Sequence, residues 1–326
     1  MQAIVIDDGA LRLCEVPTPR YGADELLIDI HASAVNRADL RRAASHFAGS
    51  EGDASVAIGG LEMAGTVAVL GANVAGFAVG DRVMAMTGRA WAEQVAVDHR
   101  LALPVPDGFD WTEAAATPIS FVTAHDALAS AAELRAGETV LVRGATSAAG
   151  LASVQVARAL GAARVFATTN SPGKLDALAE LGAEPLDSSN GPLAPLLDRL
   201  TDGHGVDVVI DIVGATAVQD NIDAAAVTGR IVCLGRLAGT EGTFNLDEFS
   251  RKRIRMIGVT FRTRSLEERF AVISRFRREL LPLLAAREVR PVIDRTFSLA
   301  ETEEAEQYVR DNRSFGKVVI RVRDSD

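Results

Sequence analysis

Cysteine is scarce in this chain, with only Cys14 and Cys233 among its 326 residues. The two lie far apart in the sequence, so a disulfide framework is excluded and a cytoplasmic location is expected. The chain has no CxxC and no HxxxH spacing, and its five histidines are scattered at positions 31, 46, 99, 125 and 204. Because zinc sites need clustered ligands of these types, we expect no metal.

Long apolar runs and excess positive charge are also missing. No apolar stretch approaches the length of a membrane span, and residues 1–5 read as a strand without a signal-peptide pattern. The net charge of −10 argues against a nucleic-acid or anionic-membrane partner. With 48% hydrophobic residues, the composition is that of an ordinary globular protein long enough for two domains.

The GxGxxG fingerprint of dinucleotide-binding proteins is absent as well. In its place the sequence GATSAAG, residues 144–150, follows a β-branched apolar strand at 139–142. Apolar residues then recur at helical spacing up to Leu160, Gly161 ends the helix, and residues 164–169 form a second β-rich run. This pattern predicts a mononucleotide-binding βαβ unit whose turn and helix dipole bind a pyrophosphate. The alternative is a tight strand-to-helix turn that binds nothing.

An acidic residue is missing where NAD-preferring sites place one, about 20 residues after the glycines. The sequence there is TTNS, residues 168–171, and Lys174 follows on the first turn of a helix that Ser171 and Pro172 are suited to start. Hydroxyl and ammonium groups pair with a ribose 2′-phosphate, whereas a carboxylate repels it. The region therefore favours NADPH over NADH, unless Lys174 is only a solvated helix lysine.

The predicted secondary structure changes in kind near residue 112. Before it, short strands such as 26–30, 65–70 and 81–86 are punctuated by Gly and Pro, which indicates a compact antiparallel β domain. After it, helices alternate with six β-branched strands, which predicts a doubly wound parallel sheet: 139–142, 164–168, 184–187, 207–212, 230–234 and 255–260. The tail from 265 to 322 gives helices, a strand near Arg295 and a final strand at 317–322, and is expected to rejoin the first domain.

Several segments spread over nearly the whole chain are similar to those of one known family. They are AVNRADL at 34–40, GLEMAG at 60–65, GDRV at 80–83, GATSAAG at 144–150, SPGK at 171–174 and GKVV at 316–319. The chain resembles a medium-chain dehydrogenase/reductase of the zinc-free quinone oxidoreductase branch. The segment VTFRTRS at 259–265 is similar to the tumour-suppressor-inducible NADPH:quinone reductases in particular.

The resemblance implies a two-domain α/β protein. A GroES-like antiparallel β domain for the substrate is expected over residues 1–118 and 265–326, and a six-stranded doubly wound (Rossmann) domain for NADPH over 119–264. Zinc-dependent members carry a Cys near position 36 and a His inside the Gly-x-Glu motif. This chain has Asn36 and Leu61 there, neither of them a good zinc ligand, so the resemblance also implies no metal.

The resemblance further implies a set of cofactor-binding residues in a cleft between the domains. Asn36 and Thr123 are expected near the nicotinamide, and Asn36 is also the candidate catalytic residue that positions substrate and nicotinamide. The other expected contacts are Ser147, Ala148 and Ala149 for the pyrophosphate; Thr169, Ser171 and Lys174 for the ribose phosphate; Val213, Leu234 and Phe261 for the remaining groove; and Asn312 to close it.

Simpler roles are open for some of these residues. Asn36 is alternatively a turn amide bonded to its own backbone, and Thr123 a helix hydroxyl bonded one turn back. Related reductases often carry a substrate-side tyrosine about eleven residues after the asparagine, but this chain has Phe47 there, beside His46. These two are expected to line the substrate site, and His46 is either a substitute proton donor or an ordinary loop residue.

The resemblance thus implies an NADPH-dependent oxidoreductase that reduces quinones or related conjugated carbonyls by hydride transfer, without metal. An enoyl or 2-alkenal double-bond reductase has the same fold and cofactor. A weakly catalytic NADPH-binding sensor is the alternative from another class, since fold does not fix function. A homodimer through the last Rossmann strand, 255–260, is also expected, unless Arg253 and Arg255 protect that edge.

Overall fold

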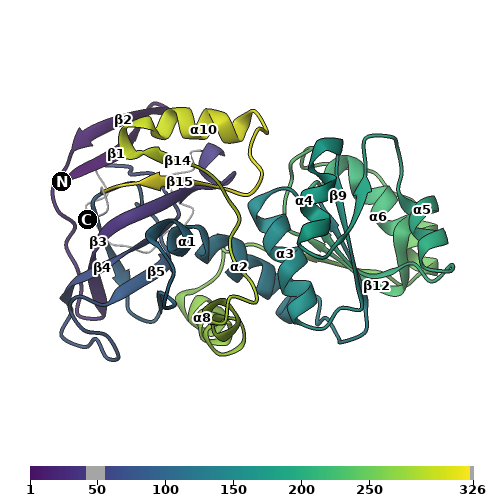
Figure 1. The fold of residues 1–326 in the computed structure, drawn as a ribbon, viewed down its shortest axis with the longest axis horizontal. Helices are drawn as coiled ribbons and strands as arrows, with labels where there is room; N and C mark the ends of the chain where they lie inside the picture. The colour runs from purple at the N-terminus through teal and green to yellow at the C-terminus, as the bar shows by residue number, and fades with distance from the viewer. Residues whose placement is uncertain (42–55, 324–326) are drawn as a thin grey trace. The chain divides into compact units, whose positions relative to one another are not determined.

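The computed structural model of the protein describes residues 1–41 and 56–323 (Figure 1). The chain divides into two compact units. We call residues 123–260 the central unit, and residues 1–122 with 261–326 the split unit. The boundary between Val122 and Thr123 falls inside helix α2 (Pro118–His125).

The central unit is built on six parallel strands in the order β10-β9-β8-β11-β12-β13. This is the strand order of a classic dinucleotide-binding sheet, so the predicted doubly wound fold is confirmed. The strands are β8 (Thr139–Arg143), β9 (Arg164–Thr169), β10 (Glu184–Asp187), β11 (Val206–Asp211), β12 (Ala225–Cys233) and β13 (Arg255–Gly258). The helices are α3 (Ala148–Ala159), α4 (Leu175–Glu180), α5 (Ala194–Leu200), α6 (Val218–Ala224) and α7 (Leu246–Arg251).

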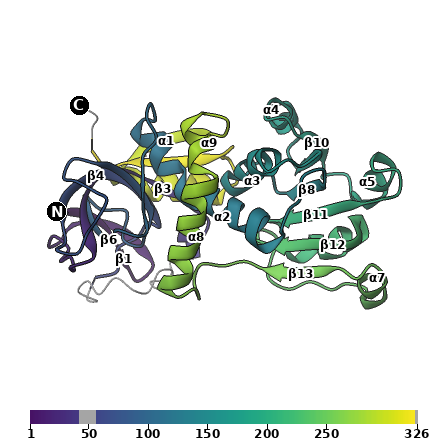
Figure 2. The same ribbon diagram turned by 90° about the horizontal axis from the view of Figure 1, so that it is seen from below.

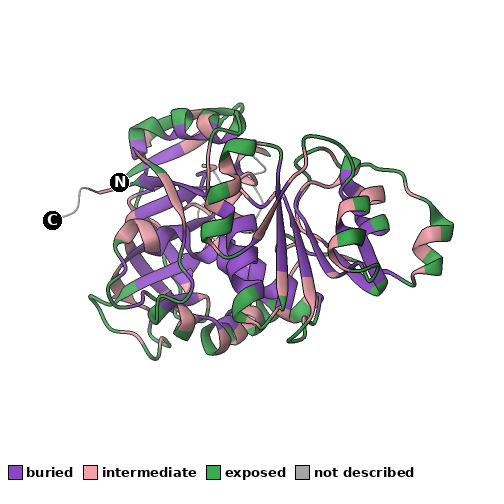
Figure 3. Ribbon diagram, turned by 45° about the vertical axis from the view of Figure 1, so that its right-hand side comes forward, coloured by how far each residue is buried: buried purple, intermediate pink, exposed green. Residues whose placement is uncertain are grey.

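The central strands are apolar on both faces because helices cover the sheet on both sides (Figure 3). Leu141, Phe166, Val209 and Ile231 lie in its core with at most 1% of their surface exposed. Figure 2 shows β13 as the last strand on one side of this sheet. Its only partner in the described sheet is β12, so its outer edge is unpaired.

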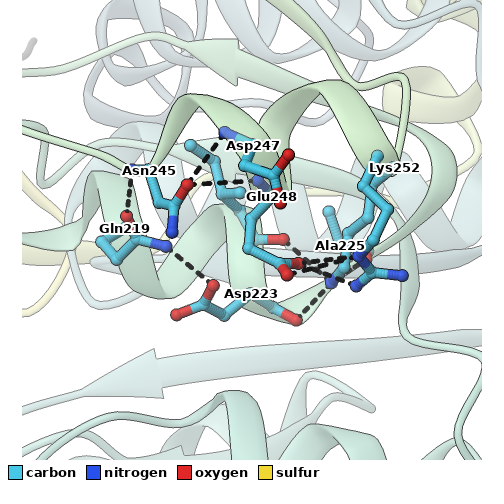
Figure 4. Close-up of polar contacts among 9 residues, drawn as sticks. Gln219, Asp223, Ala225, Asn245, Asp247, Glu248 and Lys252 are labelled. Atoms are coloured by element: carbon cyan, nitrogen blue, oxygen red, sulfur yellow. Dashed lines mark hydrogen bonds and ion pairs between the residues drawn. The ribbon is translucent and has the colours of Figure 1, made fainter.

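A lysine clasp closes the end of α6 (Figure 4). The ammonium of Lys252 donates to the carbonyl oxygens of Ile222, Asp223 and Ala225 at 3.1, 2.6 and 2.8 Å. Carbonyl groups at helix ends have no intrahelical partners, and Lys252 donates all three of its ammonium N–H groups to them. Nearby, the Asn245 side chain accepts from the first N–H groups of α7. The clasp therefore fixes α6 to α7.

The split unit contains a mostly antiparallel sheet in the order β14-β15-β3-β4-β5-β7, with β6 also pairing β3. As predicted, the C-terminal tail rejoins this unit, because β15 pairs antiparallel with β3. Its strands are β1 (Gln2–Asp7), β2 (Ala10–Glu15), β3 (Glu25–Val35), β4 (Glu62–Leu70), β5 (Arg82–Met86), β6 (Gln94–Asp98), β7 (Ala102–Pro104), β14 (Ile293–Ser298) and β15 (Lys317–Arg321). Its helices besides α2 are α1 (Trp111–Ala116), α8 (Leu266–Glu279), α9 (Leu281–Ala285) and α10 (Thr302–Arg310).

Within residues 1–41 and 56–323, no helix combines the length and the apolar character that a membrane span requires.

Candidate active site

The carboxyl ends of the central strands gather several of the expected cofactor residues at one edge of the sheet. Ser147 follows β8, Thr169 ends β9, Val213 follows β11 and Leu234 follows β12. These four strands are neighbours and parallel. Backbone bonds join the loops there: the N–H of Ala145 donates to the carbonyl of Thr168 at 2.9 Å. Ligands of open α/β sheets bind outside this edge.

The turn at 144–150 has a glycine at each end because the backbone there does not accommodate a side chain. Gly144 has φ +71°, a left-handed conformation that favours glycine. A Cβ on Gly150 would lie 2.6 Å from the Cα of Ala145, so glycine is required there too. The Ser147 hydroxyl accepts from the Gly150 N–H at 3.2 Å and donates to the Gly144 carbonyl at 2.9 Å. Ser147 therefore caps α3 and stabilises the turn from within.

This geometry fits a pyrophosphate. Helix α3 begins at Ala148, so the N–H groups of Ala148 and Ala149 belong to its first turn, where no intrahelical acceptor is available. The positive end of the helix dipole lies at the same place. Small side chains at 148 and 149 leave access to these donors, as the sequence predicted for this turn.

Asp211 organises the neighbouring loop and was missed by the sequence analysis. One of its carboxylate oxygens accepts from the N–H groups of Val213 and Gly214, each at 2.9 Å. Burial raises the pKa of Asp211, while these two donors and nearby Arg143 oppose the rise. Asp211 thus holds Val213 against the edge. The sequence did offer a sign of this role, because Asp211 is the one acidic residue in the otherwise apolar run 208–213 that leads to Gly214.

The segment 169–174 differs in detail from the expected helix start. Thr169 is 3% exposed, and its hydroxyl accepts from the Ser171 N–H at 3.1 Å. As expected, a helical turn starts after Ser171 with Pro172 in its first position, but it is a 3₁₀ turn (Pro172–Lys174) that precedes α4, and the Ser171 side chain makes no capping bond. Ser171 instead donates to the Asn170 side chain at 3.4 Å. Ser171 and Lys174 share this turn and are both half-buried, and no acid stands between residues 168 and 174.

In the split unit, Asn36 follows the end of β3 and is held by two charged residues. Its Nδ2 donates to Glu62 Oε1 at 2.9 Å, and its Oδ1 accepts from Lys317 Nζ at 2.6 Å. The same ammonium lies 2.5 Å from Glu62 Oε1. The alternative that the Asn36 amide bonds its own backbone is therefore wrong.

Glu62 and Lys317 were not proposed as site residues from the sequence. Each is the first residue of its strand and is followed directly by apolar residues, and they are 0% and 1% exposed. Charges are almost never buried so deeply unless they are paired. Two charges that each open a strand and precede apolar residues were thus the available signal, although it does not say that they meet at Asn36.

Asp39 completes this cluster. The backbone N–H of Asn36 donates to Asp39 Oδ2 at 2.7 Å. Burial, with the negative charges of Glu62 and Glu306 nearby, raises the pKa of Asp39 to about 8, against the opposing effects of that N–H bond and Lys317. Asp39 therefore keeps its proton at neutral pH.

We expect Asp39→Asn to stabilise the protein by roughly 4 kcal/mol at pH 7, because Asp39 must take up a proton on folding at this pH and the amide need not. Asp39 has a pKa in the folded state above its unfolded value of 3.8, so wild-type stability falls as pH rises from about 4 to about 8. The asparagine variant lacks this slope, and its advantage grows over that window. Urea unfolding at pH 5 and pH 8 checks this; an advantage that is equal at both pH values would contradict it.

The remaining expected residues fall in both units. Thr123 lies in α2, half-buried, in the central unit. Phe261 and Asn312 belong to the split unit. Phe261 is 9% exposed with the Arg264 guanidinium over its ring, and Asn312 has φ +58° and accepts from the Arg37 guanidinium through Oδ1. His46 and Phe47 lie outside the described residues.

The positions that bear zinc ligands in related enzymes have no ligand chemistry here. Leu61 is buried, and both ends of the Asn36 amide are taken by Glu62 and Lys317. Among residues 1–41 and 56–323 there is no group of three or more His, Cys, Asp or Glu side chains able to hold a metal ion.

Two family models match the chain. One is described as the alcohol dehydrogenase GroES-like domain, over residues 22–107, and the other as zinc-binding dehydrogenase, over 148–278. Quinone oxidoreductase-like protein 2 of Bos taurus is 31% identical over 309 residues, covering 94% of this chain and 88% of that protein.

Two other similarities bear on the cofactor and the reaction. The spectinabilin polyketide synthase system protein NorB of Streptomyces orinoci is 30% identical over 97% of this chain, which spans only 14% of that protein. A mycobacterial protein solved in complex with NADPH has a TM-score of 0.86 at 27% identity, covering 99% of this chain and 100% of the other.

Proposed function

Because the chain belongs to the medium-chain dehydrogenase/reductase family, in its quinone oxidoreductase branch, we propose that it reduces quinones or related conjugated carbonyls with NADPH and without metal. Members of this family are oxidoreductases that bind a nicotinamide cofactor. The observation that carries the proposal is made at the carboxyl edge of the central sheet. There the turn at 144–150, with a glycine at each end, follows the strand next to the one that leads into the Ser171–Lys174 turn.

NADPH rather than NADH is supported by the charges at that edge. Ser171 and Lys174 offer a hydroxyl and an ammonium, and the segment carries no carboxylate to accept from a ribose 2′-OH. The first-turn N–H groups at Ala148 and Ala149 would hold the pyrophosphate, with Val213 and Leu234 along the groove. We assign the central unit to the cofactor, and the split unit with Asn36 to the substrate.

When bound, the dinucleotide supplies the hydride for the reduction. The chain's own contribution is to orient the acceptor and to present polar groups where negative charge develops on its oxygen. Asn36 is the residue we assign to this task. A conjugated acceptor spreads that charge over several atoms, which lowers the demand for a metal or a strong acid.

A substrate panel tests the proposal. With purified protein, we expect NADPH absorbance to fall on addition of a simple 1,4-quinone, and NADH to be oxidised at least about tenfold less efficiently, as loss of a charge-assisted bond implies. Turnover of 2-alkenals but not quinones would instead support an alkenal or enoyl reductase. That second reading is favoured by the similarity to a polyketide synthase protein over 97% of this chain. Tight NADPH binding with turnover of neither class would indicate a binding protein or sensor.

We also propose a homodimer through β13. Its outer edge is unpaired in the described sheet, and Met256 on it is 37% exposed. The alternative of a protected edge is weakened because Arg255 turns to Glu133 at 3.9 Å. Two such edges that meet across a two-fold axis would form one continuous sheet. Sedimentation should give twice the chain mass for wild type and a shift toward monomer for Met256→Lys, which sets like charges against each other; a monomeric wild type would remove the proposal.

A further inference from the structure

The Asn36 side chain is oriented by a pair of buried opposite charges. An ammonium has no acceptor and a carboxylate has no donor, so Lys317 can only bond the amide oxygen and Glu62 only the amide nitrogen. A flipped amide would set donor against donor and acceptor against carboxylate. One of the two orientations is therefore strongly favoured.

The pair itself is firmly anchored. The second carboxylate oxygen of Glu62 accepts from the Ile119 N–H at 2.8 Å, at the start of α2. Lys317 Nζ also lies 3.4 Å from Ser120 Oγ, one residue further along the same helix. Strands β15, β3 and β4 are consecutive neighbours in the sheet, which fixes the heights of Lys317 and Glu62 on either side of Asn36.

The charge balance around the pair is kept by Asp39. Glu62 and Glu306 lie near Asp39, and the positive charges beside them are Lys317 and Arg310, which pairs with Glu306 at 3.7 Å. Full ionisation of all three carboxyl groups would leave one negative charge in excess in a buried place. Asp39 stays protonated, so Lys317 remains committed to Glu62 and Asn36. The cluster is thus built around one ion pair rather than a diffuse network.

Asn36 differs from its partners because it is only half-buried, whereas Glu62 and Lys317 are nearly inaccessible. Its amide nitrogen carries two hydrogens, and Glu62 takes one. We propose that Lys317 and Glu62 are positioning residues, which lock the Asn36 amide so that its second Nδ2–H donates to the carbonyl oxygen of the substrate. This rests on the proposed function for the role of that oxygen, but not for the locking.

The locking is tested on the protein without cofactor. In ¹⁵N-labelled wild type, we expect one Asn36 side-chain proton to resonate downfield and to exchange slowly, because it is bonded to a carboxylate. Its signal is assigned by its loss in Asn36→Ala. Glu62→Gln should move it upfield, while Gln94→Ala, which removes a different amide in the same unit, should not. An Asn36 amide that exchanges as fast as exposed amides in wild type would overturn the locking, whether or not any substrate is turned over.

The positioning role is tested by kinetics in the wild-type and Asn36→Ala backgrounds. Glu62→Gln is expected to lower kcat about 10–100-fold, the cost of misplacing a contact, while the Kd for NADPH stays within about twofold. In the Asn36→Ala background the same change should cost less than about threefold, because residues acting as a unit are not additive. Equal losses in both backgrounds would show that Glu62 acts independently of Asn36. Lys317→Arg should retain more activity than Lys317→Met, and the reverse order would contradict a charge-based role.

These arms separate the two levels of proposal. If wild type reduces neither quinones nor enones, the proposed function is refuted. The exchange rate of the Asn36 amide would still decide whether Glu62 and Lys317 lock that amide. Normal wild-type turnover with an unlocked amide would refute the inference alone. Circular dichroism and thermal unfolding of each variant establish that a loss of kcat is measured on folded protein.

Discussion

Lys174→Glu is expected to lower kcat/KM for NADPH by about 10²–10³-fold while changing that for NADH by no more than a few-fold. A charge-assisted hydrogen bond contributes about 1.5–3 kcal/mol, and the new carboxylate adds repulsion against a 2′-phosphate. NADH has no such phosphate, and a carboxylate near its ribose 2′-OH is the arrangement of NAD-preferring sites. The result would therefore be a reversed cofactor preference rather than an inactive protein.

Steady-state kinetics with both cofactors measure this directly. Arg199→Glu is the matched control, because it makes the same charge reversal on an exposed residue. Arg199 lies near the C-terminus of α5, the helix that precedes β11, and so toward the opposite edge of the sheet. The control should leave the cofactor preference within about twofold, as expected for screened surface charges. An equal effect of both variants would attribute the change to net charge, and no effect of Lys174→Glu would leave Lys174 as a solvated helix lysine.

Glu138→Ala is expected to destabilise the central unit by about 3–5 kcal/mol. Arg230 on β12 is 8% exposed and makes a two-pronged pair with Glu138, with one bond at 3.0 Å. Its Nε also donates to the Ala132 carbonyl at 2.9 Å. Removal of Glu138 would leave a buried guanidinium without a counter-charge, which is much more costly than breaking a surface pair.

Urea unfolding with a parallel probe of nicotinamide binding checks this prediction. Glu248→Ala, which breaks the exposed pair with Arg251 on α7, is the control and should cost less than about 1 kcal/mol. Glu138 directly precedes β8, and Arg230 on β12 is level with Arg255, the first residue of β13. Both therefore lie toward the amino edge of the sheet, away from the turn at 144–150, and the folded variant should retain its cofactor affinity. Equal costs for the two variants would show that the buried pair has no special weight.

The elements that were predicted from sequence are those specified by local pattern. The six central strands are apolar runs between turn residues, and Gly144 and Gly161 mark the ends of the first strand and its helix through positive φ. The return of the tail could also be seen, because residues 317–322 form an isolated strand after the parallel series. The carboxyl ends of these strands were predicted to within about two residues, whereas β12 begins at Ala225, well before the predicted 230–234, because its pairing with β11 already starts there.

The parts that could not be predicted depend on residues distant in sequence. Glu62 and Lys317 were visible only as members of similar segments, because their meeting at Asn36 depends on the register of β15, β3 and β4. The sequence indicated the helical turn after Ser171 but not its 3₁₀ form, nor that the Ser171 hydroxyl bonds Asn170 instead of capping the turn. The cofactor-binding roles stay predictions for all the expected residues: Asn36, Thr123, Ser147, Ala148, Ala149, Thr169, Ser171, Lys174, Val213, Leu234, Phe261 and Asn312.

The lysine clasp on α6 has a consequence for the chemistry of the whole chain. The protein has only three lysines, Lys174, Lys252 and Lys317. Lys252 spends its three N–H bonds on carbonyls, and Lys317 is shut in with Glu62. The third lysine, Lys174, is half-buried and ends the 172–174 turn. Because lysine is so scarce, lysine labelling distinguishes few sites, and under the proposed function a label on Lys174 would report on the ribose phosphate of the cofactor.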